Sequence, residues 1–123
     1  MMNLGNFSVS LAVKNIKKSK AFYQKLGFTV LDGNEKEGWL ILQNGTTNIG
    51  LFQGMFEKNL LTFNPGWNEN GKEVQNFTDV REIQAKLKEA GIKIDSEVES
   101  SSGPGHFTLT DPDGNQILID QHR

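Results

Sequence analysis

The chain has 123 residues, a formal net charge of −2, two histidines and no cysteine. This length fits one domain with its own core, and the lack of cysteine excludes disulfides and thiolate chemistry. The charge shows no basic excess, which argues against nucleic acid as a partner; the short apolar runs and the lack of a signal-peptide pattern predict a cytoplasmic protein with no membrane partner.

The first half of the chain predicts a strand, a helix and three more strands. Residues 7–13 alternate between apolar and small side chains, as in a strand with one face on a core. Asn15 is a good N-cap for the helix, and Gly27 ends it. Five residues of this segment follow one another at helical spacing: Ile16, Ser19, Phe22, Tyr23 and Leu26. The three strands are expected over residues 28–31, 39–43 and 46–53.

The second half predicts the same order of elements. Residues 60–64 are typical of a strand that Pro65-Gly66 ends, and Asp79 caps a helix that stops at Gly91. A short strand is expected over residues 92–94, before a polar loop rich in serine and glycine. At the end, the turn Asp111-Pro112-Asp113-Gly114-Asn115 joins two alternating runs into a hairpin, over residues 106–110 and 116–120.

The repeated order predicts an α+β fold made of two βαβββ modules of roughly sixty residues each. We expect a single domain over residues 1–123, with module one at about 1–54 and module two at about 59–123. For the second module to be complete, part of the loop over residues 95–105 has to pair as the third element.

Three stretches are distinctive when they occur together: Leu11-Ala12-Val13-Lys14-Asn15 leading to Ser19-Lys20-Ala21-Phe22-Tyr23-Gln24-Lys25-Leu26-Gly27-Phe28, then Thr78-Asp79-Val80 with the helix to Lys88-Glu89-Ala90-Gly91, and the turn at 111–115. In these stretches the chain resembles the vicinal-oxygen-chelate superfamily, which includes glyoxalase I, extradiol dioxygenases, and fosfomycin- and bleomycin-resistance proteins. The resemblance implies curled mixed sheets around a central cavity. It also implies a homodimer, in some members with modules exchanged between chains.

The positions that match the metal ligands of this superfamily carry unsuitable side chains here. The resemblance puts Ser8 at the first ligand position and Leu118 at the last. The ligand from the second module falls on Leu60 in one register and on Lys72 in the other. A hard cation needs several oxygen or imidazole donors at one point, and this set does not supply them. The chain therefore resembles the metal-free members of the superfamily, and we expect no metal and no cofactor.

The resemblance also indicates which strand face borders the cavity, since ligand positions and their neighbours two residues away share a face. Small polar side chains follow that face, whereas Phe7, Val9, Leu11 and Val13 turn to the helices. Aromatic residues are expected to close the cavity, although Phe52 and Phe63 also suit the core. The predicted ligand-binding residues are Ser8, Ser10, Trp39, Phe52, Leu60, Thr62, Trp67, His106, Thr108, Leu118 and Asp120.

Several polar residues admit more than one interpretation. His106 is a candidate general base, or else an exposed histidine at a strand end. Trp67 lies in a loop and is expected to contact either a ligand or a partner subunit. His122 is expected to be frayed. A metal site rebuilt from His106, Asp120 and Glu73 is an alternative, and the cations Lys14, Lys72 and Arg81 are either solvated or meet an anionic ligand.

Three functions are consistent with these observations. The first is a metal-free protein that binds a small organic molecule in the cavity. The second, the alternative, is a lyase or isomerase of the glyoxalase type with a displaced or non-metal site. The third is a protein without a ligand whose sheets serve dimerisation only. Ser8 and Leu118 count against the second function, and the polar strand face counts against the third.

Overall fold

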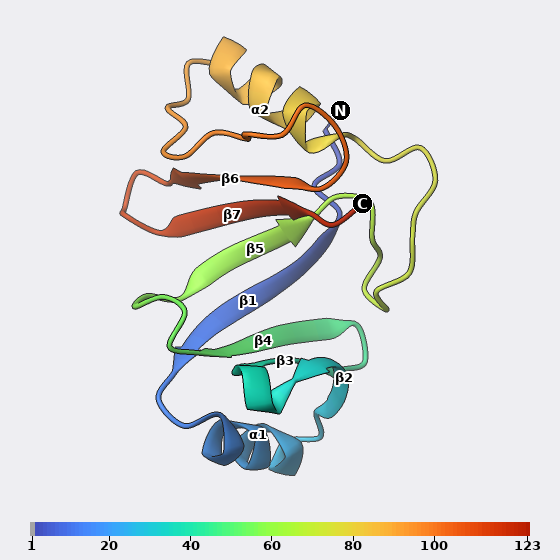
Figure 1. Cartoon of the computed structure of the whole chain (residues 1–123), viewed down its shortest axis with the longest axis vertical. Helices are drawn as coiled ribbons and strands as arrows, with labels where there is room; N and C mark the ends of the chain where they lie inside the picture. Colours follow the sequence, from blue (N-terminus) through green and yellow to red (C-terminus); the bar gives the residue numbers. More distant parts are fainter. Residues whose placement is uncertain (1) are drawn as a thin grey trace. The chain divides into compact units, whose positions relative to one another are not determined.

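A computed structural model describes residues 2–123, which fold as two compact units with one helix each. The α1 unit is Ser8–Leu60, and the α2 unit combines the N-terminal residues up to Phe7 with Leu61–Arg123. The elements are β1 (Asn6–Val13), α1 (Ile16–Lys25), β2 (Thr29–Asn34), a 3-10 turn (Glu35–Glu37), β3 (Trp39–Asn44), β4 (Thr47–Gln53), β5 (Leu60–Asn64), α2 (Val80–Glu89), β6 (Gly105–Thr110) and β7 (Gln116–Gln121). The predicted α+β class, with mixed sheets and two helices, is confirmed (Figure 1).

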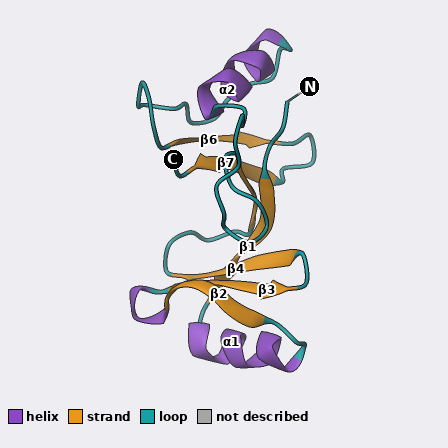
Figure 2. Cartoon of the chain, turned by 90° about the vertical axis from the view of Figure 1, so that its right-hand side faces the viewer, coloured by secondary structure: helices purple, strands orange, loops and turns teal. Residues whose placement is uncertain are grey.

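The α1 unit has the strand order β2-β3-β4-β1. Strands β2, β3 and β4 are antiparallel neighbours, while β1 pairs in parallel with β4 from Val9↔Ile49 to Val13↔Gln53. Helix α1 lies along one face of this sheet (Figure 2). The core between helix and sheet consists of Ile16, Leu40, Leu42 and Leu51, with Leu11 and Val13 packed against it. As predicted, the apolar side of β1 therefore faces the helix in this unit.

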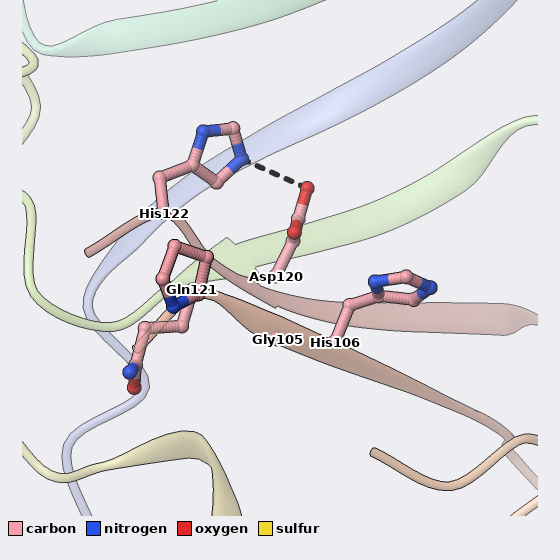
Figure 3. Close-up of a pocket in the computed structure, with 6 residues that line it drawn as sticks. Gly105, His106, Asp120, Gln121 and His122 are labelled. Carbon is pink, nitrogen blue, oxygen red and sulfur yellow. Dashed lines mark hydrogen bonds and ion pairs between the residues drawn. The ribbon is translucent and has the colours of Figure 1, made fainter. Parts of the chain in front are cut away.

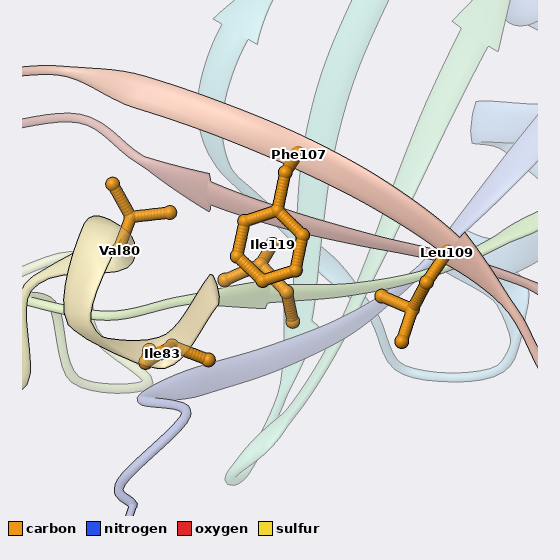
Figure 4. Packing of buried hydrophobic residues seen from close by; sticks show 5 residues of the cluster. All are labelled: Val80, Ile83, Phe107, Leu109 and Ile119. Atoms are coloured by element: carbon orange, nitrogen blue, oxygen red, sulfur yellow. The ribbon is translucent and has the colours of Figure 1, made fainter. Parts of the chain in front are cut away.

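The α2 unit has the strand order β5-β7-β6, with β5 parallel to β7 and β7 antiparallel to β6. Its core brings one face of α2 onto the β6–β7 hairpin, with Val80, Ile83, Phe107, Leu109 and Ile119 buried (Figure 4). Burial of such a side chain contributes roughly 1.5–3 kcal/mol. Phe63 packs against this core and its ring lies 5.0 Å from that of Phe7, so the core interpretation of Phe63 is confirmed.

The two helices begin in the same way, which supports the predicted repeat. Asn15 and Asp79 are the N-caps, and their side chains accept hydrogen bonds from Lys18 N and Arg81 N. In each unit a glutamine at the end of a strand also reaches the first helical N–H. Gln53 Oε1 accepts from Ile16 N at 2.8 Å, and Gln121 Oε1 accepts from Val80 N at 2.7 Å. Each helix start is thus fixed both by its cap and by the sheet.

One strand expected from the sequence is absent, and helical spacing does not by itself mark burial. Phe22 in α1 and Leu26 at its C-cap are 60% and 58% exposed. Residues 92–94 form no strand. The loop instead contributes a single bridge between Ser96 and Thr108, with Asp95 N donating to Thr108 O at 2.8 Å. Within residues 95–104 this bridge is the only strand-like pairing of the serine- and glycine-rich loop.

The predicted turn at 111–115 is built around one carboxylate. Asp111 Oδ1 accepts hydrogen bonds from the backbone N–H groups of Asp113 and Asn115, and its Oδ2 accepts from Asn115 Nδ2. The side chain of Asn115, followed by these backbone donors, holds the pKa of Asp111 below its usual value. Gly114 has a φ of +88°, the left-handed region that favours glycine. This turn sets the register of β6 and β7.

A loop between β5 and α2 is folded back on itself. Trp67 bridges to Glu73, and Val74 N donates to Gly66 O at 2.8 Å. The Arg123 guanidinium donates to Val74 O at 2.8 Å and lies 4.7 Å from the centre of the Phe77 ring. The C-terminal residue thus holds this loop in place. Within residues 2–123, neither helix has the length and apolar composition that crossing a membrane requires.

Candidate functional site

The face of the α1-unit sheet opposite the helix combines small residues with aromatic ones. Strand pairing places Trp39 beside Phe52 and Phe52 beside Ala12, which makes one row across β3, β4 and β1. The next row is Ile41, Gly50 and Ser10. The Phe52 and Phe56 rings are 5.4 Å apart, and Phe52 is outside the cluster that packs on α1. Phe52 thus lies on the sheet face opposite α1, and its role as a ligand contact stays a prediction.

Gly50 lies under the Phe52 ring on this face. A Cβ added there would lie 2.5 Å from Cε2 of Phe52 and 3.4 Å from Cδ1 of Ile41. Any side chain at position 50 would have to displace the Phe52 ring. Ser10 beside it is buried, while Ser8, Trp39 and Phe52 are half-buried. The sequence did not single out Gly50, because a glycine inside a strand signals close approach without saying to what.

In the α2 unit, the predicted site residues also share the sheet face opposite the helix. Thr62 pairs with Leu118 across β5 and β7, and Leu118 pairs with Thr108 across β7 and β6. One step along the hairpin, His106 pairs with Asp120. Leu60, the first residue of β5, is half-buried and belongs to the α1 unit. The alternative position, Lys72, is exposed in the loop before α2.

A pocket of about 360 Å³ opens at one end of this hairpin. Its lining is Pro104, Gly105, His106, Asp120, Gln121 and His122. His106, Asp120 and His122 project from the same side of the hairpin, whereas Gln121 points the other way (Figure 3). His122 Nε2 lies 2.9 Å from Asp120 Oδ2, and the His122 ring centre lies 4.9 Å from that of Trp67. The structure thus places His106 and Asp120 in one pocket with His122, and the Trp67 ring packs against His122.

The expectation that His122 is frayed is wrong. Its ring is held by Asp120 on one side and by Trp67 on the other. The signal in the sequence was its spacing: His122 lies two residues after Asp120, so it shares a strand face with that residue. The expectation of fraying came instead from its position one residue before the end of the chain.

The polar loop beside the pocket is fixed by Arg81. Its guanidinium donates to Ser100 O at 3.0 Å and to Gly103 O at 2.7 Å, and it pairs with Asp79 at 2.8 Å. Burial raises the pKa of Asp79, but the hydrogen bonds from Arg81 and Gln121 outweigh burial and hold that pKa below its usual value. Arg81 therefore acts inside the fold, and neither interpretation from the sequence, a solvated cation or an anion-binding one, describes it.

The positions of the usual metal ligands show no donor set. Ser8 and Leu118 are half-buried residues of β1 and β7. Across the residues that the structure describes, no group of three or more histidine, aspartate or glutamate side chains is arranged to hold a metal ion. Glu73, named for a rebuilt site, instead pairs with Arg123 at 3.4 Å. The residues present do not fit the metal that the superfamily implies.

Solved structures with the same fold come from several proteins. A structure named as the NAD-dependent benzaldehyde dehydrogenase from Legionella pneumophila has a TM-score of 0.72 at 22% identity, covering 95% of this chain and 99% of that one. A glyoxalase/bleomycin resistance protein/dioxygenase superfamily member from Vibrio splendidus 12B01 has a TM-score of 0.66 at 19% identity, covering 94% of this chain and 97% of that one. An extradiol ring-cleaving dioxygenase from B. fuscum has a TM-score of 0.56 at 16% identity, with 96% of this chain covering 32% of the enzyme. At these identities the likeness concerns the fold.

A search among curated proteins finds no significant match to the sequence. The model of the Glyoxalase/Bleomycin resistance protein/Dioxygenase superfamily, in contrast, matches residues 7–119. That match spans both units, from β1 to the middle of β7. The chain therefore belongs to the glyoxalase/bleomycin resistance protein/dioxygenase superfamily.

Proposed function

We propose that the protein binds a small, mainly apolar organic molecule on the Trp39–Phe52 face of the α1 unit, without the usual metal ligands of its superfamily. The observation that carries the proposal is the pair of rows Trp39–Phe52–Ala12 and Ile41–Gly50–Ser10. The Phe52 ring covers Gly50, since a Cβ there would lie 2.5 Å from it, and the Trp39 and Phe52 rings offer an apolar surface on this face. Small-molecule sites are lined mainly by apolar and aromatic side chains with a few polar groups.

The chemistry of this face indicates the class of ligand. Trp39 and Phe52 can stack on a planar ring, a contact that contributes about 0.5–1.5 kcal/mol beyond area burial. The Ser10 hydroxyl is the polar group nearest to Gly50 in the strand pairing. The two rows contain no charged side chain. An uncharged aromatic or alicyclic compound therefore suits the face better than a phosphate or carboxylate does. On the α2 unit, Thr62, Thr108 and Leu118 stay proposed ligand contacts.

The experiment is a thermal-shift screen followed by fluorescence titration. A ligand that binds only the folded state raises the melting temperature. The chain has two tryptophans, so the Trp67→Phe variant leaves Trp39 as the single reporter for each compound found. In that background Gly50→Val is expected to weaken binding at least tenfold, roughly 1.4 kcal/mol, because the new side chain displaces the Phe52 ring. Phe52→Leu is expected to weaken it similarly without adding bulk.

The control is Thr47→Val, which introduces the same residue type at an exposed position of the same strand. Its titration should overlay the unmodified background. If compounds raise the melting temperature but neither Gly50→Val nor Phe52→Leu changes their affinity, the ligand binds elsewhere and this assignment is wrong. If no compound of the screened class binds, the proposed function itself fails.

We also propose that the protein is a homodimer, which the resemblance to the superfamily implies. Light scattering on the eluting peak of a sizing column measures the molar mass directly. A mass near twice 13.7 kDa supports the proposal, and a mass near 13.7 kDa at micromolar concentration contradicts it.

A further inference from the structure

The pocket of the α2 unit is lined by hydrogen-bond acceptors. Among its six lining residues, the ionisable ones are Asp120, His106 and His122, with no lysine or arginine. A carboxylate only accepts hydrogen bonds, and a neutral imidazole has one accepting nitrogen. At about 360 Å³ the pocket is at the small end of ligand sites. It therefore suits a small molecule that brings its own donors.

Asp120 occupies the middle of this acceptor group. Its side chain is 32% exposed and lies between the two imidazoles in Figure 3. Oδ2 accepts from His122 Nε2 at 2.9 Å, and a carboxylate offers about four lone-pair positions, so further donors can be accommodated. His106 stands opposite Asp120 in the strand pairing, which places their Cβ atoms about 4.5–5.5 Å apart. A donor on Asp120 is thus within reach of the His106 ring.

The adjacent cation does not neutralise the pocket. Arg123 follows His122 in the chain, but alternation turns it to the side of Gln121. There its guanidinium donates to Val74 O at 2.8 Å and pairs with Glu73 at 3.4 Å. Arg81 is occupied by Asp79, Ser100 and Gly103. Both arginines therefore stabilise the loops around the pocket and leave its interior with the charge of Asp120.

The pocket wall is already in place before any ligand arrives. Gln121, only 2% exposed, donates from Nε2 to Gly103 O at 3.1 Å and to Arg123 O at 2.9 Å. Ser100 Oγ donates to Pro104 O at 2.8 Å. The ring of Trp67 lies against His122. Such pre-organisation lowers the entropy cost of binding, since the ligand does not have to order the residues that line the pocket.

From this geometry we infer that the pocket binds a small primary amine, whose ammonium group sits on Asp120 with His106 as a second acceptor. An ammonium group carries three donors and a positive charge, which match this pocket. A carboxylate or phosphate would meet the Asp120 charge and find no cation. Because the carboxylate is partly exposed, binding should be weak, with a Kd on the order of 1 mM. The inference concerns a pocket of the α2 unit, whereas the proposed function concerns the Trp39–Phe52 rows of the α1 unit, and the inference does not rest on that function.

The test uses three probes of one shape: benzylamine, the neutral benzyl alcohol and the anionic benzoate. Each is titrated into the full chain at low salt and at a pH of about 8, where imidazole groups are ordinarily neutral. NMR signals of the His106 and His122 rings report on the pocket. Benzylamine is expected to move both sets of signals saturably, and to bind at least tenfold more tightly than either of the other probes. Added salt should weaken benzylamine alone.

Variants identify the groups responsible. Asp120→Asn is expected to weaken benzylamine at least tenfold, and His106→Gln roughly threefold. The matched control is Glu97→Gln, because Glu97 pairs with Lys88 and does not line the pocket. Should Asp120→Asn fail to fold, the comparison of benzylamine with benzyl alcohol in the unmodified chain still decides. Equal affinity of these two probes overturns the inference, as does a folded Asp120→Asn that binds benzylamine unchanged. Trp39 fluorescence reports separately on the α1 unit, so failure here leaves the proposed function intact.

Discussion

At the scale of single residues, two glutamines make hydrogen bonds that the sequence pattern did not reveal. Gln53 and Gln121 end strands and reach the first N–H of a helix in their own unit. The partners of Gln121 are distant in the chain: it contacts Asp79 and Val80, 42 and 41 positions earlier. Local periodicity carries no information on such contacts, and the same holds for the ring of Trp67 against His122. The contacts of these residues follow only from the folded structure.

Replacing Gln121 by leucine tests this role. The variant keeps the side-chain volume but leaves Val80 N–H buried without its acceptor and removes the donor to Asp79 and Gly103. The expected loss is roughly 2–4 kcal/mol in the free energy of unfolding, measured by urea titration. Gln116→Leu at the exposed start of the same strand is the control and should change stability by less than about 0.5 kcal/mol. Equal effects of the two variants would mean that the Gln121 hydrogen bonds contribute nothing.

At the scale of elements, periodic segments and turns were predictable, and irregular segments were not. Both helices, the 111–115 turn and six of the eight expected strands matched within about two residues, since period, caps and turn residues are local properties. Strand β2 ends three residues later than expected, at Asn34. The strand expected over residues 92–94 failed because two apolar residues do not specify a partner strand. Phe22 shows the related limit: helical spacing predicted the helix but not which edge of it is covered.

The N-cap of α2 makes stability depend on pH. The pKa of Asp79 lies below its ordinary value of 3.8 in the folded chain, so its ionised form stabilises the fold above that value. This contribution is lost as the pH falls through the folded-state pKa. Asparagine also caps helices well, but carries no charge. Asp79→Asn should therefore be less stable than the unmodified chain at pH 7, and the difference should shrink toward pH 3. Urea titrations at both pH values measure it, and a constant difference would contradict the assignment.

At the scale of the whole molecule, the superfamily fold is retained while its metal positions are not. Each of the two units has one helix, and the two helices begin in the same way. The fold was predictable because its turns and caps are distinctive, whereas the candidate site depended on side-chain register. Strand pairing places His106 opposite Asp120, and it places Gly50 in the row next to that of Phe52. Composition alone shows neither of these neighbours. The same scaffold can thus keep its shape and change its chemistry.

The loss of the metal positions has a direct thermodynamic consequence. A metal ion held by three or more protein ligands binds the folded state and raises the melting temperature, in proportion to the logarithm of its concentration over Kd. Since Ser8 and Leu118 supply no such ligands, zinc, nickel or manganese at about a hundred micromolar should raise the melting temperature by less than about 1 °C, and chelation should not lower it.

The two histidines provide the internal check on this prediction. If a metal does stabilise the chain by several degrees, a displaced site is present, and it has to use imidazole or carboxylate groups. His106→Gln and His122→Gln then separate the cases. Loss of the metal effect in either variant would locate the displaced site in the α2-unit pocket and favour the glyoxalase-type alternative over a metal-free binding protein. A metal effect that persists in both would place the ligands among the carboxylates elsewhere, where no group of three was found in residues 2–123.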